Sequence, residues 1–243
     1  MEAARSALPK QVQQIFERDG VVNEAVARGI VNYRALARWI MDVTRVEASE
    51  DAVLSAIRRI RGHPSIRPFR TAHKVVAESH LNVRSGLCQV TAPRTKHVQE
   101  RLAGIFREID FERGEILYYT QGEGGIKVLV DEANLKKVQT HLGGHILETT
   151  KHLAAVSIVE PREGLQTPGI LALLTNALAL QNINIVDAVF GLPDYLFFVR
   201  QEDTLRAYQA LETLIAVSKQ EVQAERAPRS PARPTPRRAV ARA

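Results

Sequence analysis

The chain has 243 residues, of which 45% are hydrophobic and 25% are charged. That apolar fraction is typical of a folded protein and too high for general disorder, and the length allows one large domain or several small ones. The formal net charge of +6 suggests a nucleic-acid binder, but the charge is unevenly distributed. The last 18 residues carry six Arg and no acid, whereas the first 225 residues have no net charge. A uniformly basic domain is therefore excluded.

The cysteine content and the absence of long apolar runs narrow the class further. A single cysteine, Cys88, excludes an intrachain disulfide and a multi-cysteine metal site. The first residues contain no apolar run of the kind found in secretory signals, and no segment approaches the roughly 18 apolar residues of a membrane span. We expect a soluble cytoplasmic protein that does not associate with membranes.

Residues 1–80 are predicted to form a helical N-terminal domain. Asn32 is placed to cap a helix that runs to Val43, and Ser49 is placed to cap the next helix. A further short helix is expected over 71–78.

From residue 81 a pattern of strand, helix, strand, strand and helix occurs twice, over 81–151 and 152–224. Equivalent points of the two copies lie 68 to 72 residues apart, which indicates an internal duplication. The α+β unit that this order predicts is ferredoxin-like, with both helices on one face of an antiparallel sheet. Because the other face stays uncovered, the two units are expected to pack together. The expected strands are 86–90, 116–120, 126–130, 145–151, 153–159, 183–190 and 195–200, and the closing helix is 203–217.

Residues 225–243 contain four Pro and six Arg and offer almost no apolar surface to bury. This composition predicts a disordered basic tail. Such a tail is either merely solvated or an anchor for nucleic acid or an acidic partner.

The start of the helix in the second copy is the best candidate binding site. Thr167 suits an N-cap, Pro168 the first helical position, and Gly169 then falls in the first turn, where backbone N–H groups have no helical partner. A glycine lets a ligand approach those groups, which favours a small anion such as a carboxylate. Asn182 and Asn184 follow the helix and either bind polar groups or satisfy a turn. The alternative is a helix start without a ligand.

This arrangement resembles the ACT domain. The resemblance rests on Thr-Pro-Gly-Ile at 167–170, the apolar helix that follows, Asn-Ile-Asn-Ile at 182–185 and the strand ending at 197–199. It implies a module that binds amino acids, with effectors between paired modules. Residues 83–151 resemble a degenerate second module whose loop 92–96 lacks the Pro-Gly pair, so that module is expected to serve chiefly in packing. The effector-binding residues that the resemblance implies are Gln166, Thr167, Gly169, Ile170 and Asn184.

The whole chain, including residues 29–38, resembles archaeal proteins described as predicted ACT-containing regulators of amino-acid metabolism. The resemblance implies an amino-acid effector and a homo-oligomer, with a dimer expected.

The N-terminal helices also allow a helix-turn-helix interpretation. The second of these helices would offer Ser55, Arg58, Arg59 and Arg61 to DNA. Against it, the turn over 44–49 is long for that motif, and a net charge of +4 over residues 1–80 is modest. The alternative is a helical packing or dimerisation domain.

The remaining motifs predict no catalysis, no metal site and no cofactor. The glycines at 122–125 lie between two strands, which is typical of a hairpin turn. His141 and His145 are four residues apart, but two glycines interrupt the helix that would align them, and Cys88 lies in an apolar strand.

These observations favour a non-enzymatic regulator of amino-acid metabolism that binds an amino-acid effector through tandem ACT-like modules. Three alternatives remain open: an amino-acid-responsive DNA-binding transcriptional regulator, a regulatory subunit that docks on a biosynthetic enzyme, and a structural module whose site is empty.

Overall fold

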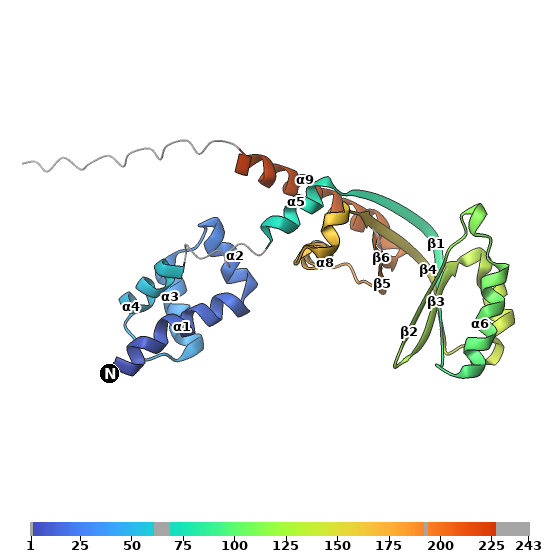
Figure 1. Cartoon of the computed structure of the whole chain (residues 1–243), viewed down its shortest axis with the longest axis horizontal. Helices are drawn as coiled ribbons and strands as arrows, with labels where there is room; N and C mark the ends of the chain where they lie inside the picture. The colour runs from blue at the N-terminus through green and yellow to red at the C-terminus, as the bar shows by residue number, and fades with distance from the viewer. Residues whose placement is uncertain (1, 61–68, 192–193, 227–243) are drawn as a thin grey trace, which may run out of the picture. The chain divides into compact units, whose positions relative to one another are not determined.

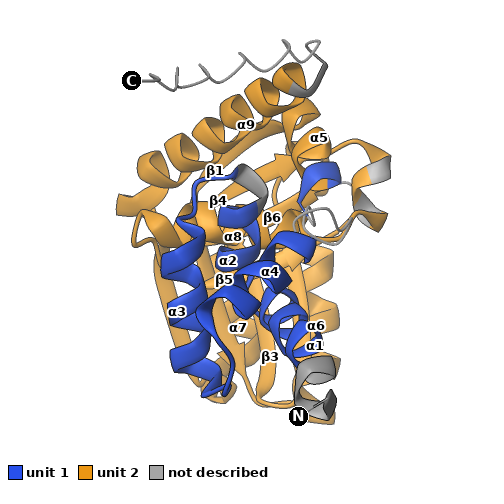
Figure 2. Ribbon diagram, turned by 90° about the vertical axis from the view of Figure 1, so that its left-hand side faces the viewer, with its two compact units in different colours: residues 1–71 blue, residues 72–243 orange. Residues whose placement is uncertain are grey.

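The computed structural model describes residues 2–60, 69–191 and 194–226. The chain divides into two compact units, residues 1–71 and 72–243 (Figure 2). The division lies near the start of α5 (Arg70–Glu78) and not after it, as a domain over 1–80 would require. The reason is that Ala72, Val75 and Val76 of α5 are buried in a core of the second unit.

The first unit contains four helices in its described part: α1 (Glu2–Arg18), α2 (Gly20–Arg28), α3 (Tyr33–Thr44) and α4 (Glu50–Ile60). Both predicted caps are present. The Asn32 side chain accepts hydrogen bonds from the N–H groups of Arg34 and Ala35 at 3.0 and 3.2 Å. The Ser49 hydroxyl accepts one from the N–H of Ala52 at 3.3 Å. One apolar face of each helix meets in a shared core that includes Val12, Phe16, Val26, Ile40, Val53 and Ile57.

The described part of the second unit is built on six strands: β1 (His80–Ala92), β2 (Leu117–Gly122), β3 (Gly125–Asp131), β4 (Glu148–Val159), β5 (Asp187–Phe190) and β6 (Asp194–Arg200). They form one antiparallel sheet in the order β2-β3-β1-β4-β6-β5 (Figure 1). Besides α5, its helices are α6 (Lys96–Glu108), α7 (Leu135–Leu142), α8 (Ile170–Leu180) and α9 (Thr204–Arg226). Short 3-10 turns are η2 (Phe111–Arg113), η3 (Glu132–Asn134), η4 (Gly143–His145), η5 (Arg162–Gln166) and η6 (Gln201–Asp203).

The two central strands are longer than the sequence predicts. The expected strands over 145–151 and 153–159 are one strand, β4, and β1 extends well beyond the expected 86–90. Residues 80–84 of β1 pair with 155–159 of β4, next to the second half of the sheet, and 89–91 pair with 148–150, next to the first half. The first strand–helix–strand–strand–helix segment therefore gains a fourth strand from the first part of β4, and the second segment gains one from the first part of β1. Both central strands thus belong to both halves of the sheet.

Two irregular positions mark the point where the halves of the sheet meet. The register between β1 and β4 shifts around Leu87, beside Gly86 with φ 73° and His152 with φ 56°. A shift of one residue moves the following side chains to the opposite face of a strand. Because of these shifts, Cys88 on β1 faces α6 and α7 while Val156 on β4 faces α8 and α9, so the helices of both halves lie on the same side.

The face of the sheet opposite the helices encloses a further core. Its buried members are Leu87, Leu129, Leu153, Ala155, Leu196 and Phe198. Tyr118 on β2 packs edge-on against Phe198 on β6, with ring centroids 5.9 Å apart. Lys127 on β3 pairs with Asp187 on β5 at 2.9 Å. Strands at the two ends of the sheet thus touch, which requires the sheet to curl so that its two halves pack on each other across this core.

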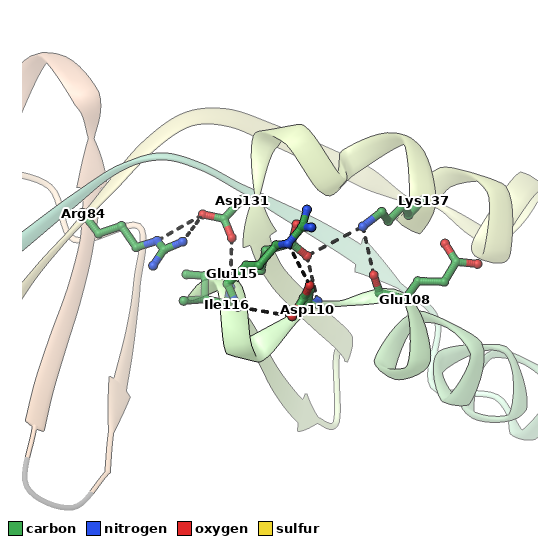
Figure 3. A network of polar contacts seen from close by, with 8 residues as sticks. Arg84, Glu108, Asp110, Glu115, Ile116, Asp131 and Lys137 are labelled. Atoms are coloured by element: carbon green, nitrogen blue, oxygen red, sulfur yellow. Dashed lines mark hydrogen bonds and ion pairs between the residues drawn. The ribbon is translucent and has the colours of Figure 1, made fainter.

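A polar network fixes the entry to β2 (Figure 3). Asp131 at the end of β3 accepts hydrogen bonds from the backbone N–H of Ile116 at 2.9 Å and from the Arg84 guanidinium at 2.6 Å. Lys137 on α7 lies 3.7 Å from the Glu115 carboxylate. Arg84 belongs to the part of β1 that pairs beside the second half, so this network also joins the halves.

Candidate functional site

The candidate site is built on the loop between β4 and α8. The loop folds on itself through two backbone hydrogen bonds, from the N–H of Gly164 to the carbonyl of Pro161 at 2.9 Å and from the N–H of Thr167 to the carbonyl of Gly164 at 2.8 Å. Gly169 then adopts φ 95°, a left-handed conformation that glycine reaches without the strain of a side chain. The loop is therefore a compact turn ending in a residue whose backbone conformation favours glycine.

The prediction that Thr167 caps the helix is wrong. The helix begins at Ile170, because the left-handed Gly169 separates it from Thr167, and Gly169 occupies the cap position. The first intrahelical bond runs from the N–H of Leu173 to the carbonyl of Gly169 at 3.1 Å. The N–H groups of residues 170–172 precede that bond and have no acceptor within the helix, so the expected anion-binding groups lie two residues later than predicted.

The structure brings the first four expected binding residues together in one segment. Gln166 is exposed, Thr167 and Gly169 are half-buried, and Ile170 is buried in the core beneath α8. Ile170 therefore offers its backbone N–H to the loop, whereas its side chain packs inward.

The fifth expected residue, Asn184, is not near the other four within one chain. It is exposed and lies between the end of α8 and the start of β5. At 1.5 Å per residue, the 11 residues of α8 span about 16 Å and separate Asn184 from Gly169. Asn182 adopts φ 53° and its N–H donates to the carbonyl of Ala179 at 2.9 Å, so it forms the turn that ends the helix.

Glu160 opens the loop and was not among the site residues predicted from the sequence. Its side chain is buried, with only 5% of the residue exposed, and neither carboxyl oxygen has a hydrogen-bond partner among the described residues. Burial raises the pKa of Glu160, against the opposing influence of the nearby Tyr195 hydroxyl. Burial and the Glu160 carboxyl in turn raise the pKa of Tyr195. The only sequence signal was an acidic residue directly after an apolar strand, which is also typical of a solvent-exposed strand end.

The corresponding loop in the first half of the sheet has no such turn. Thr95 caps α6 directly by accepting a hydrogen bond from the N–H of Val98 at 3.3 Å. The two histidines that the sequence singled out point to different partners: His141 lies 2.7 Å from the Glu108 carboxylate, and the ring of His145 packs on His97. Within the described ranges, no group of three or more His, Cys, Asp or Glu side chains is arranged to hold a metal ion.

Cys88 is fully buried, in agreement with the prediction. Burial, with a smaller contribution from Glu132, raises the pKa of its thiol to about 11. The thiol is therefore protonated and unreactive at neutral pH.

In the first unit, α4 has one buried and one exposed face. Val53 and Ile57 are buried, whereas Ser55, Arg58 and Arg59 are exposed. Arg61, the fourth candidate DNA-binding residue, lies outside the described residues. Throughout the part of the chain that the structure describes, no helix is long and apolar enough to cross a membrane.

Comparison with known proteins gives similarity at the level of solved structures. No family model and no curated protein match the chain. The regulatory subunit of aspartate kinase from Thermus thermophilus is 18% identical, over 55% of this chain and 95% of that one, with a TM-score of 0.46. The corresponding subunit from Thermus flavus is 17% identical, over 58% and 98%, with a TM-score of 0.46. Aspartokinase III from E. coli, in complex with aspartate and ADP, is 18% identical, over 56% and 33%, with a TM-score of 0.44. Identities and TM-scores this low carry no conclusion about function.

Proposed function

We propose that this chain is a non-enzymatic regulator of amino-acid metabolism and that residues 152–224 bind an amino-acid effector in the manner of an ACT domain. The observation that carries the proposal is the left-handed Gly169 in front of α8. Gly169 has no side chain of its own to cover the N–H groups of the first helical turn.

The effector carboxylate meets the backbone N–H groups at the start of α8. Hydrogen bonds from N–H groups to a carboxylate are charge-assisted, and the helix dipole favours an anion at this end. The exposed Gln166 and the half-buried Thr167 precede the same segment, and we expect them to contact the rest of the effector. The arrangement suits a small carboxylate more than a long polyphosphate, because one turn of a helix offers few N–H groups.

A second copy of the chain completes the site. The sequence of α8 is apolar on nearly all sides, which is typical of a helix buried all round. Ile170, Leu174 and Leu178 face the core, but Leu171 is 39% and Leu180 75% exposed.

Two α8 helices that pack antiparallel about a twofold axis cover these leucines. In that arrangement the loop before α8 lies beside the partner's Asn184. We therefore expect the wild-type chain to be a dimer and Leu180→Glu to dissociate it. Leu205→Glu, a change at a residue 66% exposed on α9, is the matched control and should leave the dimer intact. Analytical ultracentrifugation distinguishes the two variants.

Calorimetric titration of the full chain with each of the twenty amino acids tests the effector directly. Binding of one or a few of them with a 1:1 stoichiometry per chain supports the proposal. No heat and no thermal stabilisation with any of them would refute it.

DNA binding by the first unit is a second candidate output, and the exposed Ser55, Arg58 and Arg59 on one face of α4 favour it. Replacing both arginines by alanine should weaken binding to DNA fragments of different sequence by a similar factor, because such residues contact phosphates. Arg107→Ala with Arg113→Ala, which removes two exposed arginines of the second unit, is the control. Co-purification of a biosynthetic enzyme with the wild-type chain, without DNA binding, would favour the regulatory-subunit alternative.

A further inference from the structure

Glu160 is placed under the loop that precedes α8 in a way that leaves its charge without a partner. An added Cβ on Gly164 would lie 2.4 Å from the carboxyl carbon of Glu160, so the carboxyl group occupies the space that any other residue at 164 would fill. The loop therefore closes directly over an acidic group, and Gly164 permits that closure.

The groups around this carboxyl do not neutralise it. The polar neighbour that acts on it is the Tyr195 hydroxyl of β6, which carries no positive charge. No ion pair to Glu160 occurs among the described residues. A buried carboxylate without a cation is unfavourable, and proteins relieve it by pairing or protonation.

We propose that Glu160 receives the α-ammonium group of the amino-acid effector whose carboxylate binds the N–H groups at the start of α8. The inference rests on the proposed function and adds to it the residue that receives the amino group of the effector, so that binding requires a free amino group and not only a carboxylate. The two ends of the loop, Glu160 and Gly169, then bind opposite charges that are adjacent in every α-amino acid.

The folded path of the loop supports this division of roles. Glu160 contacts Gly164, and the carbonyl of Gly164 accepts the hydrogen bond from Thr167, which lies two residues before Gly169. A negative group at the start of the loop and N–H donors without an acceptor in the helix at its end are thus joined through a single turn. Binding of an amino acid supplies the missing cation to Glu160 and the missing acceptor to α8 at the same time.

The test is a double-mutant cycle between Glu160 and the amino group. Each amino acid that binds the wild-type chain is compared with its des-amino analogue, in which hydrogen replaces the amino group, on the wild type and on Glu160→Gln. Glu202→Gln, at an exposed position in the second unit, is the matched control, and thermal unfolding verifies that both variants are folded.

We expect Glu160→Gln to weaken binding of the amino acid about tenfold or more, because a hydrogen bond between charged partners is lost. The des-amino analogue should bind the wild type and Glu160→Gln with equal affinity, and Glu202→Gln should behave as the wild type. Unchanged or tighter binding of the amino acid to Glu160→Gln overturns the role of Glu160 but not the proposed function, and points to a carboxyl that is protonated in the complex. Absence of binding to the wild type by every amino acid refutes the proposed function, and this inference with it.

Discussion

Replacing Gly169 by alanine separates the conformational role of this residue from its role in binding. The backbone at 169 has φ 95°, where an L-residue with a Cβ is strained by about 1 to 2 kcal/mol. Gly169→Ala should therefore lower the free energy of unfolding of the second unit by about that amount. For a unit of this size the loss corresponds to a fall in Tm of roughly 2 to 8 °C. In the proposed site the added methyl group also crowds the N–H groups of α8, so amino-acid binding should be lost.

Gly86→Ala is the matched control for this prediction. Gly86 adopts φ 73°, and a Cβ there would meet nothing within 4 Å among the described residues. Its substitution therefore introduces comparable backbone strain at the β1 bulge, remote from the loop. Thermal unfolding should show similar losses for both variants, whereas calorimetry should show lost binding only for Gly169→Ala. Equal affinities in the two variants, or an unchanged Tm for Gly169→Ala, would refute the reasoning.

Three further predictions concern the second unit. Phe198→Ala should lower the free energy of unfolding by about 3 to 5 kcal/mol, because it opens a cavity in the core inside the curled sheet, whereas Phe190→Ala, at a residue 52% exposed, should cost far less. Folding raises the pKa of the Cys88 thiol from 9.0 to about 11, so the thiol stabilises the fold fully below about pH 9 and loses this contribution as the pH rises through about 11. The free energy of unfolding of Cys88→Ala, measured in urea, should therefore depend less on pH in that interval than that of the wild type. His73→Ala should lower the free energy of unfolding by about 1 to 3 kcal/mol, because it leaves the fully buried Ser218 hydroxyl without the ring nitrogen 2.8 Å away. Adding Ser218→Ala should cause no further loss. A double variant whose loss in urea unfolding equals the sum of the two single losses would contradict this account.

Local signals in the sequence predicted the local elements. Asn32 and Ser49 cap helices as expected, because a side-chain oxygen two or three residues before a free N–H is sufficient to form the cap. The apolar alternation around Cys88 likewise predicted its burial. Thr167 failed as a cap because the same residue pattern also fits a Pro-Gly turn, and local sequence does not distinguish a helix that starts at 168 from one that starts at 170.

Features that depend on distant contacts could not be predicted. The first residues of β1 are mostly polar and mostly exposed, and they are a strand only because 155–159 of β4 lie beside them. The merging of two expected strands into β4 depends on the same pairing. Glu160 is buried because Gly164 folds back over it, and a buried acidic residue contradicts the usual preference of its type.

The shared strands also connect the candidate site to the segment that leads to the first unit. Val159, directly before Glu160, pairs with His80 at the start of β1. Only Ser79 separates His80 from the end of α5, and α5 is fastened to α9 by the contacts of His73 with Ser218 and with Glu221, the latter at 3.3 Å. A ligand that stabilises the loop therefore acts at the end of β4, and this end is hydrogen-bonded to the start of β1, which follows α5. Such a ligand biases the position of α5 only to the extent that it binds the two arrangements with different affinity. The pairing of His80 with Val159 and the anchoring of α5 on α9 thus join the candidate loop, α5 and α9 within the second unit.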